Sequence, residues 1–509
     1  MLAPAAATRA GILRRPTVGV TLSVAAAAGI ALRIWVYRSA LGVPDSDEAV
    51  VGLMARHILH GQFTSFFWGQ AYGGSQEALL TAPVFWVFGS SWLALRVVPI
   101  VLSAVASVVV WRAGRQMIGE TGAVAAAVLL WIWPPYLLYY VTHQWGFYSS
   151  GLIYCGLLLL LAVRAAENPT RLRCALLGLG LGLALWEDVQ LAPIMVPVIG
   201  WTVWKQPRVL RQLWLAVALF VLGALPWLLY NIHHSWGSFS SPLGGNTTTY
   251  QHRLRIFGSP LLPMLLGLRA PYTQQPILAT AFADAVYVGL IGLAAYGAWA
   301  TRRRNASLLY VVLVVFPFVY AVSPQTLAEQ VPRYLLVLAP VLALLLAQLA
   351  TTRPRAVALV VVVLAVSLIN LHRMDTWWST VPPNPPIAPR NLQPLITTLD
   401  RLGVDHIYAT YWLAYRLDFE THERIIAAEN RLTAIRFVGS EALPLRDPHA
   451  RYPPYSPRVA ADPRHAFVFF NREPGLERRV ERRKMQAALV AHGYVAHPVS
   501  IFTVYSPRQ

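Results

Sequence analysis

Long apolar segments fill the first three quarters of the chain. A helix needs roughly 17–25 consecutive apolar residues to cross a bilayer, and about eleven segments of this kind occur before residue 375. They lie near residues 17–37, 92–111, 121–141, 148–163, 174–187, 189–204, 212–230, 278–300, 306–323, 334–351 and 355–371. The pattern therefore predicts a polytopic α-helical membrane domain over residues 1–375, with about eleven transmembrane helices.

The remaining residues, 380–509, are more polar and follow a different pattern. Short runs with strand-like alternation and two amphipathic helical segments predict a small α/β domain. The strands are expected at 406–411, 465–470 and 500–506, and the helices at 392–403 and 476–493. The segment 408–425 is rich in Tyr and Arg, and it belongs either to the core of this domain or to a surface that closes over a site from outside.

Composition and charge agree with a membrane protein. The chain is 56% hydrophobic and 13% charged, about half the charged fraction of a typical soluble domain. A net charge of +19 would suit a nucleic-acid partner, but the basic residues recur in every second predicted loop. Because short cytoplasmic loops hold Lys and Arg, the charge sets the topology, and no nucleic acid is expected. The alternation places loop 38–91 and residues 380–509 on the extracytoplasmic side of the cytoplasmic membrane.

Loop 38–91 opens with a cluster of acids in a chain that has few. Pro44 ends the preceding helix, and Asp45 with Glu48 three residues later has the form of a capping box. One interpretation is therefore a capped amphipathic helix lying on the membrane surface. Asp47 is a third acid with no capping role, and the amides of a helix N-terminus favour its ionised form, which suits a base or a metal ligand.

This arrangement resembles the GT-C glycosyltransferases, in particular the branch of protein O-mannosyltransferases and aminoarabinose transferases. The likeness rests on "SDEA" at 46–49, directly after the first apolar segment, and on "EQVPRYLLVLAP" at 329–340. It implies transfer of a sugar, a hexose or a pentose, from a polyprenyl-phosphate donor at the outer face of the membrane. It also implies that Asp47 is the base, that Glu48 assists through orientation or metal contact, and that Arg333 approaches the lipid phosphate. Between the two motifs, "WGQAYGGSQEALL" departs from the family pattern, which leaves a lipid, a glycan or a protein as the acceptor.

Two arginines lie within apolar segments, Arg33 in the first and Arg96 in the second. An unpaired charge within the membrane is costly, so each is expected to have a buried anionic partner. A lipid phosphate is the candidate, and Arg33 and Arg96 are therefore predicted to bind the donor phosphate together with Arg333. The alternative is that such arginines extend to the lipid headgroups.

Other polar residues at the outer ends of the segments are candidates for the substrate cavity, among them Asp45, Glu187 and Asp188. The aromatic loop "WGQAYGGSQEA" (68–78) contains Tyr72 and Glu77, which are predicted to contact a sugar. His143 is predicted to line the cavity, with a headgroup contact as the alternative. Asp188, after Glu187, could complete a site for a divalent cation (Mg²⁺ or Mn²⁺) with Asp47 and Glu48; the alternative is a solvated turn.

Two other functions compete with the enzyme. A transporter or flippase of lipid-linked sugars would place ionisable groups near the midplane and would often show repeated halves. The sequence has no such repeat, and its charges lie near the outer ends of the segments. A non-catalytic binding protein of the same fold is the second alternative, in which residues 380–509 would be the binding module.

Overall fold

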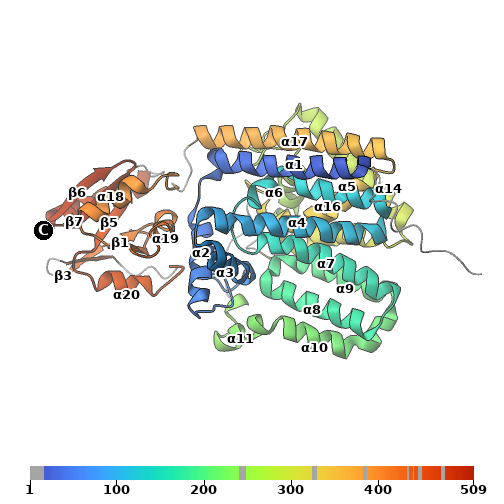
Figure 1. Ribbon diagram of the computed structural model, residues 1–509, viewed down its shortest axis with the longest axis horizontal. Coiled ribbons are helices and arrows are strands. Elements are labelled where there is room, and N and C mark those ends of the chain that lie inside the picture. The colour runs from blue at the N-terminus through green and yellow to red at the C-terminus, as the bar shows by residue number, and fades with distance from the viewer. Residues whose placement is uncertain are drawn as a thin grey trace, which may run out of the picture.

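The computed structural model describes residues 16–239, 248–323, 329–381, 387–432, 435–438, 441–444, 450–471 and 476–508. Figure 1 shows a bundle of helices whose members run along the long axis of the molecule, with a sheet-containing domain at one end of the bundle. The strands all lie in this C-terminal domain, which comprises Gln393–Pro507 in the described part of the chain.

Each of the eleven predicted apolar segments contains at least one helix. The helices are α1 (Pro16–Arg38), α4 (Trp92–Met117), α5 (Gly119–Ile132), α6 (Pro135–Tyr140), α7 (Tyr148–Glu167), α8 (Arg171–Glu187), α9 (Ala192–Lys205), α10 (Leu213–Gly223), α11 (Leu225–His233), α14 (Thr280–Thr301), α15 (Ser307–Tyr320), α16 (Ala339–Ala347) and α17 (Arg353–Thr380). Four of the described helices are long and apolar enough to cross a membrane. The number of such spans rises to six if each of two bent helix pairs forms one span. The helices in the other segments are shorter, such as α8 with 17 residues and α5 with 14, where Trp133 and Pro134 separate α5 from α6.

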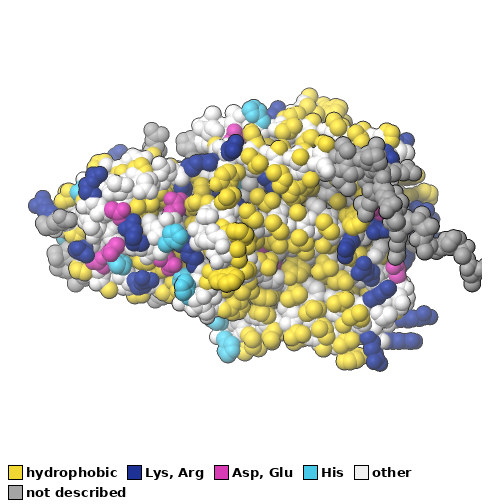
Figure 2. Space-filling model, viewed as in Figure 1, with side chains coloured by type: hydrophobic (Ala, Val, Ile, Leu, Met, Phe, Trp, Pro, Cys, Tyr) yellow, Lys and Arg dark blue, Asp and Glu magenta, His cyan; other side chains and the backbone are white. Residues whose placement is uncertain are grey.

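The surface of the bundle is apolar where lipid would cover it. Figure 2 shows hydrophobic side chains spread over the bundle, and Lys and Arg gathered at the end remote from the C-terminal domain. Arg112, Arg115 and Arg164, from two predicted cytoplasmic loops, line one pocket at that end. Lys205 Nζ donates to the carbonyl of Arg303 at 2.8 Å, which joins two further basic loops. These four loops therefore lie at the same end of the bundle in pairs, as an alternating topology requires.

Loop 38–91 folds into two helices, α2 (Ser46–Leu59) and α3 (Gln76–Phe88). The chain turns by 75° between α1 and the segment Ala40–Leu59, so that α2 crosses the end of the bundle beside the C-terminal domain (Figure 1). Asp45 is the N-cap of α2, and its Oδ1 accepts a hydrogen bond from the Glu48 amide at 3.0 Å. The acid at the start of the loop thus begins the helix that carries the other two.

The C-terminal domain contains a five-stranded sheet with the order β2-β1-β5-β7-β6. Its elements are α18 (Gln393–Arg401), β1 (His406–Ala409), α19 (Tyr411–Glu420), β2 (Ile426–Glu429), β3 (Ile435–Val438), β4 (Glu441–Pro444), α20 (Tyr455–Ala460), β5 (Ala466–Phe470), α21 (Leu476–Ala491), β6 (Tyr494–Val499) and β7 (Phe502–Pro507). β1 runs parallel to β2 and β5, whereas β7 is antiparallel to β5 and β6. The three predicted strands correspond to β1, β5 and β7, while β2 and β6 were not predicted.

Helix α19 joins the C-terminal domain to α2. Side chains of both parts share one buried apolar cluster, which includes Val50, Leu53, Tyr415 and Phe419. The guanidinium of Arg56 donates to the Phe419 carbonyl at 2.8 Å and lies 4.2 Å from the centre of its ring. A continuous core of this kind fixes the domain against the membrane bundle more firmly than surface charge pairs would.

The contact between α2 and α19 depends on the absence of a side chain at position 52. A Cβ atom on Gly52 would lie 2.4 Å from a ring atom of Phe419. Gly52→Leu is therefore expected to lower the free energy of unfolding by about 1–3 kcal/mol, because overpacking forces the two helices apart. Thermal unfolding of the purified protein in detergent measures the change. The control is Gly200→Leu, where a Cβ meets no atom within 4 Å; equal unfolding temperatures for the two variants would contradict the close packing.

Candidate active site

Asp47 lies in the first turn of α2, where the membrane bundle meets the C-terminal domain. The hydroxyl of Tyr411, the first residue of α19, donates a hydrogen bond to its Oδ1. Asp47 is partly exposed, and no donor in the described part of the chain contacts its second oxygen, Oδ2. Asp47 therefore has one oxygen held by the C-terminal domain and one available to accept a proton.

Asp45 has a structural role. Its Oδ1 caps α2, as described above, and its Oδ2 accepts a hydrogen bond from Trp145 Nε1 at 2.8 Å. Burial, together with the nearby charges of Asp47 and Glu48, raises the pKa of Asp45. With both oxygens engaged within the protein, this carboxyl group stabilises the helix start, which agrees with the capping interpretation and not with a place for Asp45 in the substrate cavity.

Glu48 forms a bidentate ion pair with Arg96 inside the protein. Arg96 Nε and Nη2 donate to its two carboxylate oxygens at 2.8 and 2.5 Å, and the Gln144 amide donates to Oε1 at 3.0 Å. The side chains are 0% and 2% exposed. Arg96 also donates to the Gly42 carbonyl at 3.0 Å. The buried anionic partner expected for Arg96 is therefore Glu48, which corrects the prediction that Arg96 binds a lipid phosphate.

The two terminal nitrogens of Arg33 have neutral hydrogen-bond partners, whereas its Nε is buried without one among the described residues. Arg33 donates to the carbonyls of Gly29 and Trp131 at 3.0 Å each and to Ser103 Oγ at 3.1 Å. Its guanidinium also lies 3.7 Å from the ring of Trp131. These contacts link α1 to α4 and α5 in the described bundle. Arg33 therefore has a packing role, which differs from its prediction as a ligand of the donor phosphate.

Arg333 lies in a neutral, aromatic environment. It begins the short 3₁₀ helix Arg333–Leu338, donates to the Tyr334 hydroxyl at 2.5 Å and lies 4.5 Å from the Tyr334 ring. Tyr140 and Tyr148 are among the groups within electrostatic range of it. In the described part of the chain no carboxylate pairs with Arg333, and its Nε is buried without a hydrogen-bond partner. Its charge is therefore available to an anionic ligand.

Two cavities meet at Tyr72. One is a cleft of about 990 Å³ between the loop 63–72, the end of α11 and the C-terminal domain. The other, of about 240 Å³, has mostly apolar walls that include Val189, Val319 and Val322. Tyr72 lines both, and the charges of Arg333, Arg451 and Asp47 act on its hydroxyl. The predicted place of Tyr72 in a substrate cavity thus has a geometric basis.

Tyr411 and Arg451 are the residues of this site that the sequence analysis did not assign. Both line the large cleft, and the Arg451 guanidinium lies 5.5 Å from the centre of the Tyr411 ring. Tyr411 belongs to the segment 408–425, which the sequence marked by its Tyr and Arg content. Arg451 had no comparable signal, because it follows a polar stretch and is far from every motif in the sequence.

Glu77 and Glu187 form a buried pair bridged by Ser150. Glu77 Oε1 accepts from the Ser150 amide at 2.8 Å and from its hydroxyl at 2.9 Å, while Glu187 Oε1 lies 2.5 Å from the same hydroxyl. A hydroxyl carries one proton, so one carboxyl must be protonated to satisfy both contacts. Burial and the proximity of Glu187 raise the pKa of Glu77 to about 8. Glu77 is 0% exposed, which corrects its prediction as a sugar contact.

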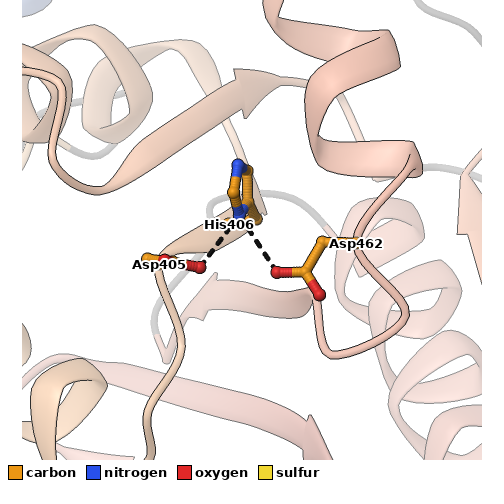
Figure 3. Close-up of side chains that lie close together, drawn as sticks. All are labelled: Asp405, His406 and Asp462. Atoms are coloured by element: carbon orange, nitrogen blue, oxygen red, sulfur yellow. Dashed lines mark hydrogen bonds and ion pairs between the residues drawn. The ribbon is translucent and has the colours of Figure 1, made fainter.

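The predicted metal ligands do not converge. Among the described residues, the one group of three His, Cys, Asp or Glu ligand atoms within 4.8 Å of one another is Asp405, His406 and Asp462. Figure 3 shows His406 Nδ1 between the two carboxylates, at 2.9 and 3.0 Å, within the C-terminal domain. Both Glu48 oxygens are occupied, and Asp188 Oδ1 accepts from the Gln190 amide at 2.8 Å. Asp47, Glu48 and Asp188 therefore do not fit a common Mg²⁺ or Mn²⁺ site.

His143 is also buried rather than directed at headgroups. Its Nδ1 contacts the Tyr139 carbonyl at 2.9 Å, and its ring stacks on Trp145 at 4.6 Å. Because Trp145 binds Asp45, His143 supports the wall behind the acidic cluster. It shapes the site through packing and does not line it.

The overall fold agrees with the predicted polytopic helical domain followed by a small α/β domain, and solved structures share it over almost the whole chain. The structure is similar to that of ArnT from Cupriavidus metallidurans in the apo state, at 12% identity and a TM-score of 0.61 over 96% of this chain and 98% of that chain. It is similar to the same protein bound to undecaprenyl phosphate, at 13% identity and a TM-score of 0.59 over 97% and 98%. An Archaeoglobus fulgidus oligosaccharyltransferase in complex with Zn and sulfate follows, at 12% identity and a TM-score of 0.51 over 95% and 72%. No protein-family model and no curated protein matches the sequence, so the likeness is one of fold.

The Glu48–Arg96 pair generates a stability prediction. Arg96→Met leaves a carboxylate buried without its cation and is expected to cost about 3–5 kcal/mol of unfolding free energy. Denaturant unfolding in mixed micelles measures the loss. Arg115→Met is the control, because its pair with Glu120 is 48% and 33% exposed and should contribute less than about 1 kcal/mol. Similar losses in the two variants would mean that Glu48 and Arg96 are not paired in the folded protein.

The raised pKa of Glu77 generates a pH prediction. The pKa of the Glu77 carboxyl is about 8 in the folded protein, whereas its ordinary value is 4.5. This difference stabilises the fold fully below pH 4.5. Between these two pH values the folded state binds more protons than the unfolded state. This contribution to stability is therefore lost as the pH rises toward 8. The unfolding temperature should therefore fall between pH 5 and 8, and Glu77→Gln should flatten this slope. Glu120→Gln, at a partly exposed position, should retain it; an unchanged slope in Glu77→Gln would contradict the shift.

Proposed function

We propose that this protein is a membrane glycosyltransferase that moves a sugar from a polyprenyl-phosphate carrier to an acceptor hydroxyl, with Asp47 as the base. The observation that carries the proposal is the position of Asp47. It is the one carboxylate of the acidic cluster with an oxygen left free by the described residues, and it lies near Tyr72, where the two cavities meet. The fold shared with ArnT, whose structure was also determined with undecaprenyl phosphate, supports the class of donor.

The donor fits the apolar side of the site. The smaller cavity has walls of Val189, Pro193 and Val319, and Tyr334 extends from it to the guanidinium of Arg333. A polyprenyl chain would contact the apolar walls, while its phosphate would take the hydrogen bonds and charge of Arg333. As the bond between the sugar and the phosphate breaks, negative charge builds up on the phosphate, and a fixed guanidinium stabilises it.

The acceptor fits the large cleft. Aromatic side chains of Trp68, Tyr230 and Tyr452 and the polar Gln70 line it, a combination typical of small-molecule sites. An acceptor hydroxyl reaching past Tyr72 would give its proton to Asp47 Oδ2 as its oxygen bonds to the sugar carbon. The phosphate leaves with the electron pair of the broken bond, so that a single displacement inverts the sugar carbon.

The sidedness of this reaction follows from the charge pattern. The basic loops gather at the end of the bundle remote from Asp47 and the C-terminal domain (Figure 2), and such loops face the cytoplasm. The charge pattern therefore supports an active site and a C-terminal domain on the extracytoplasmic side of the cytoplasmic membrane. The bound donor would lie in the outer leaflet.

The alternatives explain less of the geometry. A transporter or flippase needs ionisable groups along a path through the membrane, whereas the Glu48–Arg96 pair is closed and Asp47 lies at the end of the bundle. A non-catalytic binding protein accounts for the two cavities. It does not account for a carboxylate held by one oxygen with the other left free.

Removal of the base tests the proposal. Asp47→Asn should lower sugar transfer at least about 10³-fold, because an amide cannot accept the hydroxyl proton. The assay uses protein reconstituted in vesicles with radiolabelled sugars on undecaprenyl phosphate, and it follows label moving into envelope lipids, glycans and proteins. Asp405→Asn, an exposed acid of the C-terminal domain, is the matched control and should retain transfer. Transfer by Asp47→Asn at the wild-type rate would overturn the assignment.

A further inference from the structure

Tyr411 of the C-terminal domain forms hydrogen bonds with the first turn of α2, where the acidic cluster lies. Tyr411 is held twice by neighbouring residues of α2: its carbonyl accepts a hydrogen bond from Ser46 Oγ at 2.6 Å, and its hydroxyl donates to Asp47 Oδ1. Backbone and side chain of the same tyrosine are therefore fixed against the first turn of α2. Both the carbonyl and the hydroxyl of Tyr411 thus form hydrogen bonds with α2, in addition to the apolar packing of α19 on this helix.

The helix that carries Tyr411 is itself fixed to the same turn. Arg416, one turn further along α19 and fully buried, donates to the Pro44 carbonyl at 3.2 Å and to the carbonyls of Ala388 and Arg390 at 2.9 and 2.7 Å. A buried guanidinium with several fixed carbonyl partners has little freedom. The position of the Tyr411 hydroxyl relative to Asp47 is therefore set by the fold rather than by side-chain flexibility.

We propose that Tyr411 is the positioning residue of Asp47, and that the C-terminal domain is thereby part of the catalytic centre. This inference rests on the proposed function and adds to it the role of the domain. A phenol that donates to Oδ1 orients the carboxylate so that Oδ2 faces the acceptor. Burial, and then the charge of Asp47, raise the pKa of Tyr411 well above its usual range, so the phenol keeps its proton.

Arg451 of the same domain reinforces this arrangement. It lies against the Tyr411 ring, and its charge also acts on Asp47 and Tyr72. The C-terminal domain thus supplies both the hydrogen-bond donor and a cation to the base. From the other elements around it, Asp47 is faced by Asp45 and by Tyr72, neither of which provides a cation.

The test compares two tyrosines of one helix. Tyr411→Phe removes the hydroxyl from Asp47 and keeps the ring beside Arg451. Tyr415→Phe removes a hydroxyl one turn away that accepts a hydrogen bond from the Tyr452 amide at 2.7 Å, inside the domain core. Both variants, with wild type and Asp47→Asn, are assayed as full-length protein in vesicles with the undecaprenyl-phosphate sugar that wild type transfers.

Tyr411→Phe is expected to lower kcat roughly 10- to 100-fold with the donor KM within about 2-fold of wild type. Its pH–rate profile should differ from that of wild type, because the carboxylate loses the hydrogen-bond donor that holds Oδ1. Tyr415→Phe should leave kcat and the pH profile unchanged, whatever it costs in unfolding temperature. A Tyr411→Phe profile that superimposes on that of Tyr415→Phe would overturn the inference. If Asp47→Asn also transfers sugar at the wild-type rate, the proposed function fails; if Asp47→Asn alone is inactive, only the role of Tyr411 fails.

Discussion

The position of the candidate base depends on a buried ion pair one residue away from it. Glu48 and Arg96 are both almost fully buried and join α2 to α4. Because a carboxylate cannot stay ionised in such a place without its cation, the pair fixes the rotation of α2 about its axis. In this orientation of α2, the preceding residue, Asp47, faces Tyr411. An interaction without chemical function thus determines where the chemistry is possible.

The same helix provides the surface on which the C-terminal domain rests. Gly52 allows the Phe419 ring to approach the backbone of α2, and Arg56 closes the contact a turn later. The acidic cluster, the membrane bundle and the domain are therefore connected through fourteen residues of α2. The three acids within the four residues from Asp45 to Glu48 have three different side-chain partners, which are Trp145, Tyr411 and Arg96.

The helices were predictable from the sequence, and the candidate base could be selected from it, because both signals are local. Apolar length indicates helices, and three acids within four residues leave Asp47 without a capping role. The partners were less accessible. Arg96 is 48 residues from Glu48, and Tyr411 is 364 residues from Asp47, so no periodic pattern connects them. An arginine in an apolar segment indicates an anion but not which one, and Glu48 satisfied Arg96 where a lipid phosphate was expected. Strands β2 and β6 were missed because the Ala-rich "IAAE" of residues 426–429 and the Pro-containing "YVAHPV" of residues 494–499 lack a clear strand pattern.

Tyr72 lies between two cavities with different walls, because the smaller is mostly apolar and the larger is lined in part by the C-terminal domain. A lipid-linked donor would arrive by diffusion within the plane of the membrane, whereas an acceptor would arrive through the cleft beside the C-terminal domain. The two substrates would then not compete for one entrance, and either could bind first. Water would reach the sugar through the acceptor's cleft, so an acceptor that fills the cleft would displace the competing nucleophile as it binds. In such an arrangement, protection of the donor from hydrolysis is a property of the occupied cleft and requires no moving lid.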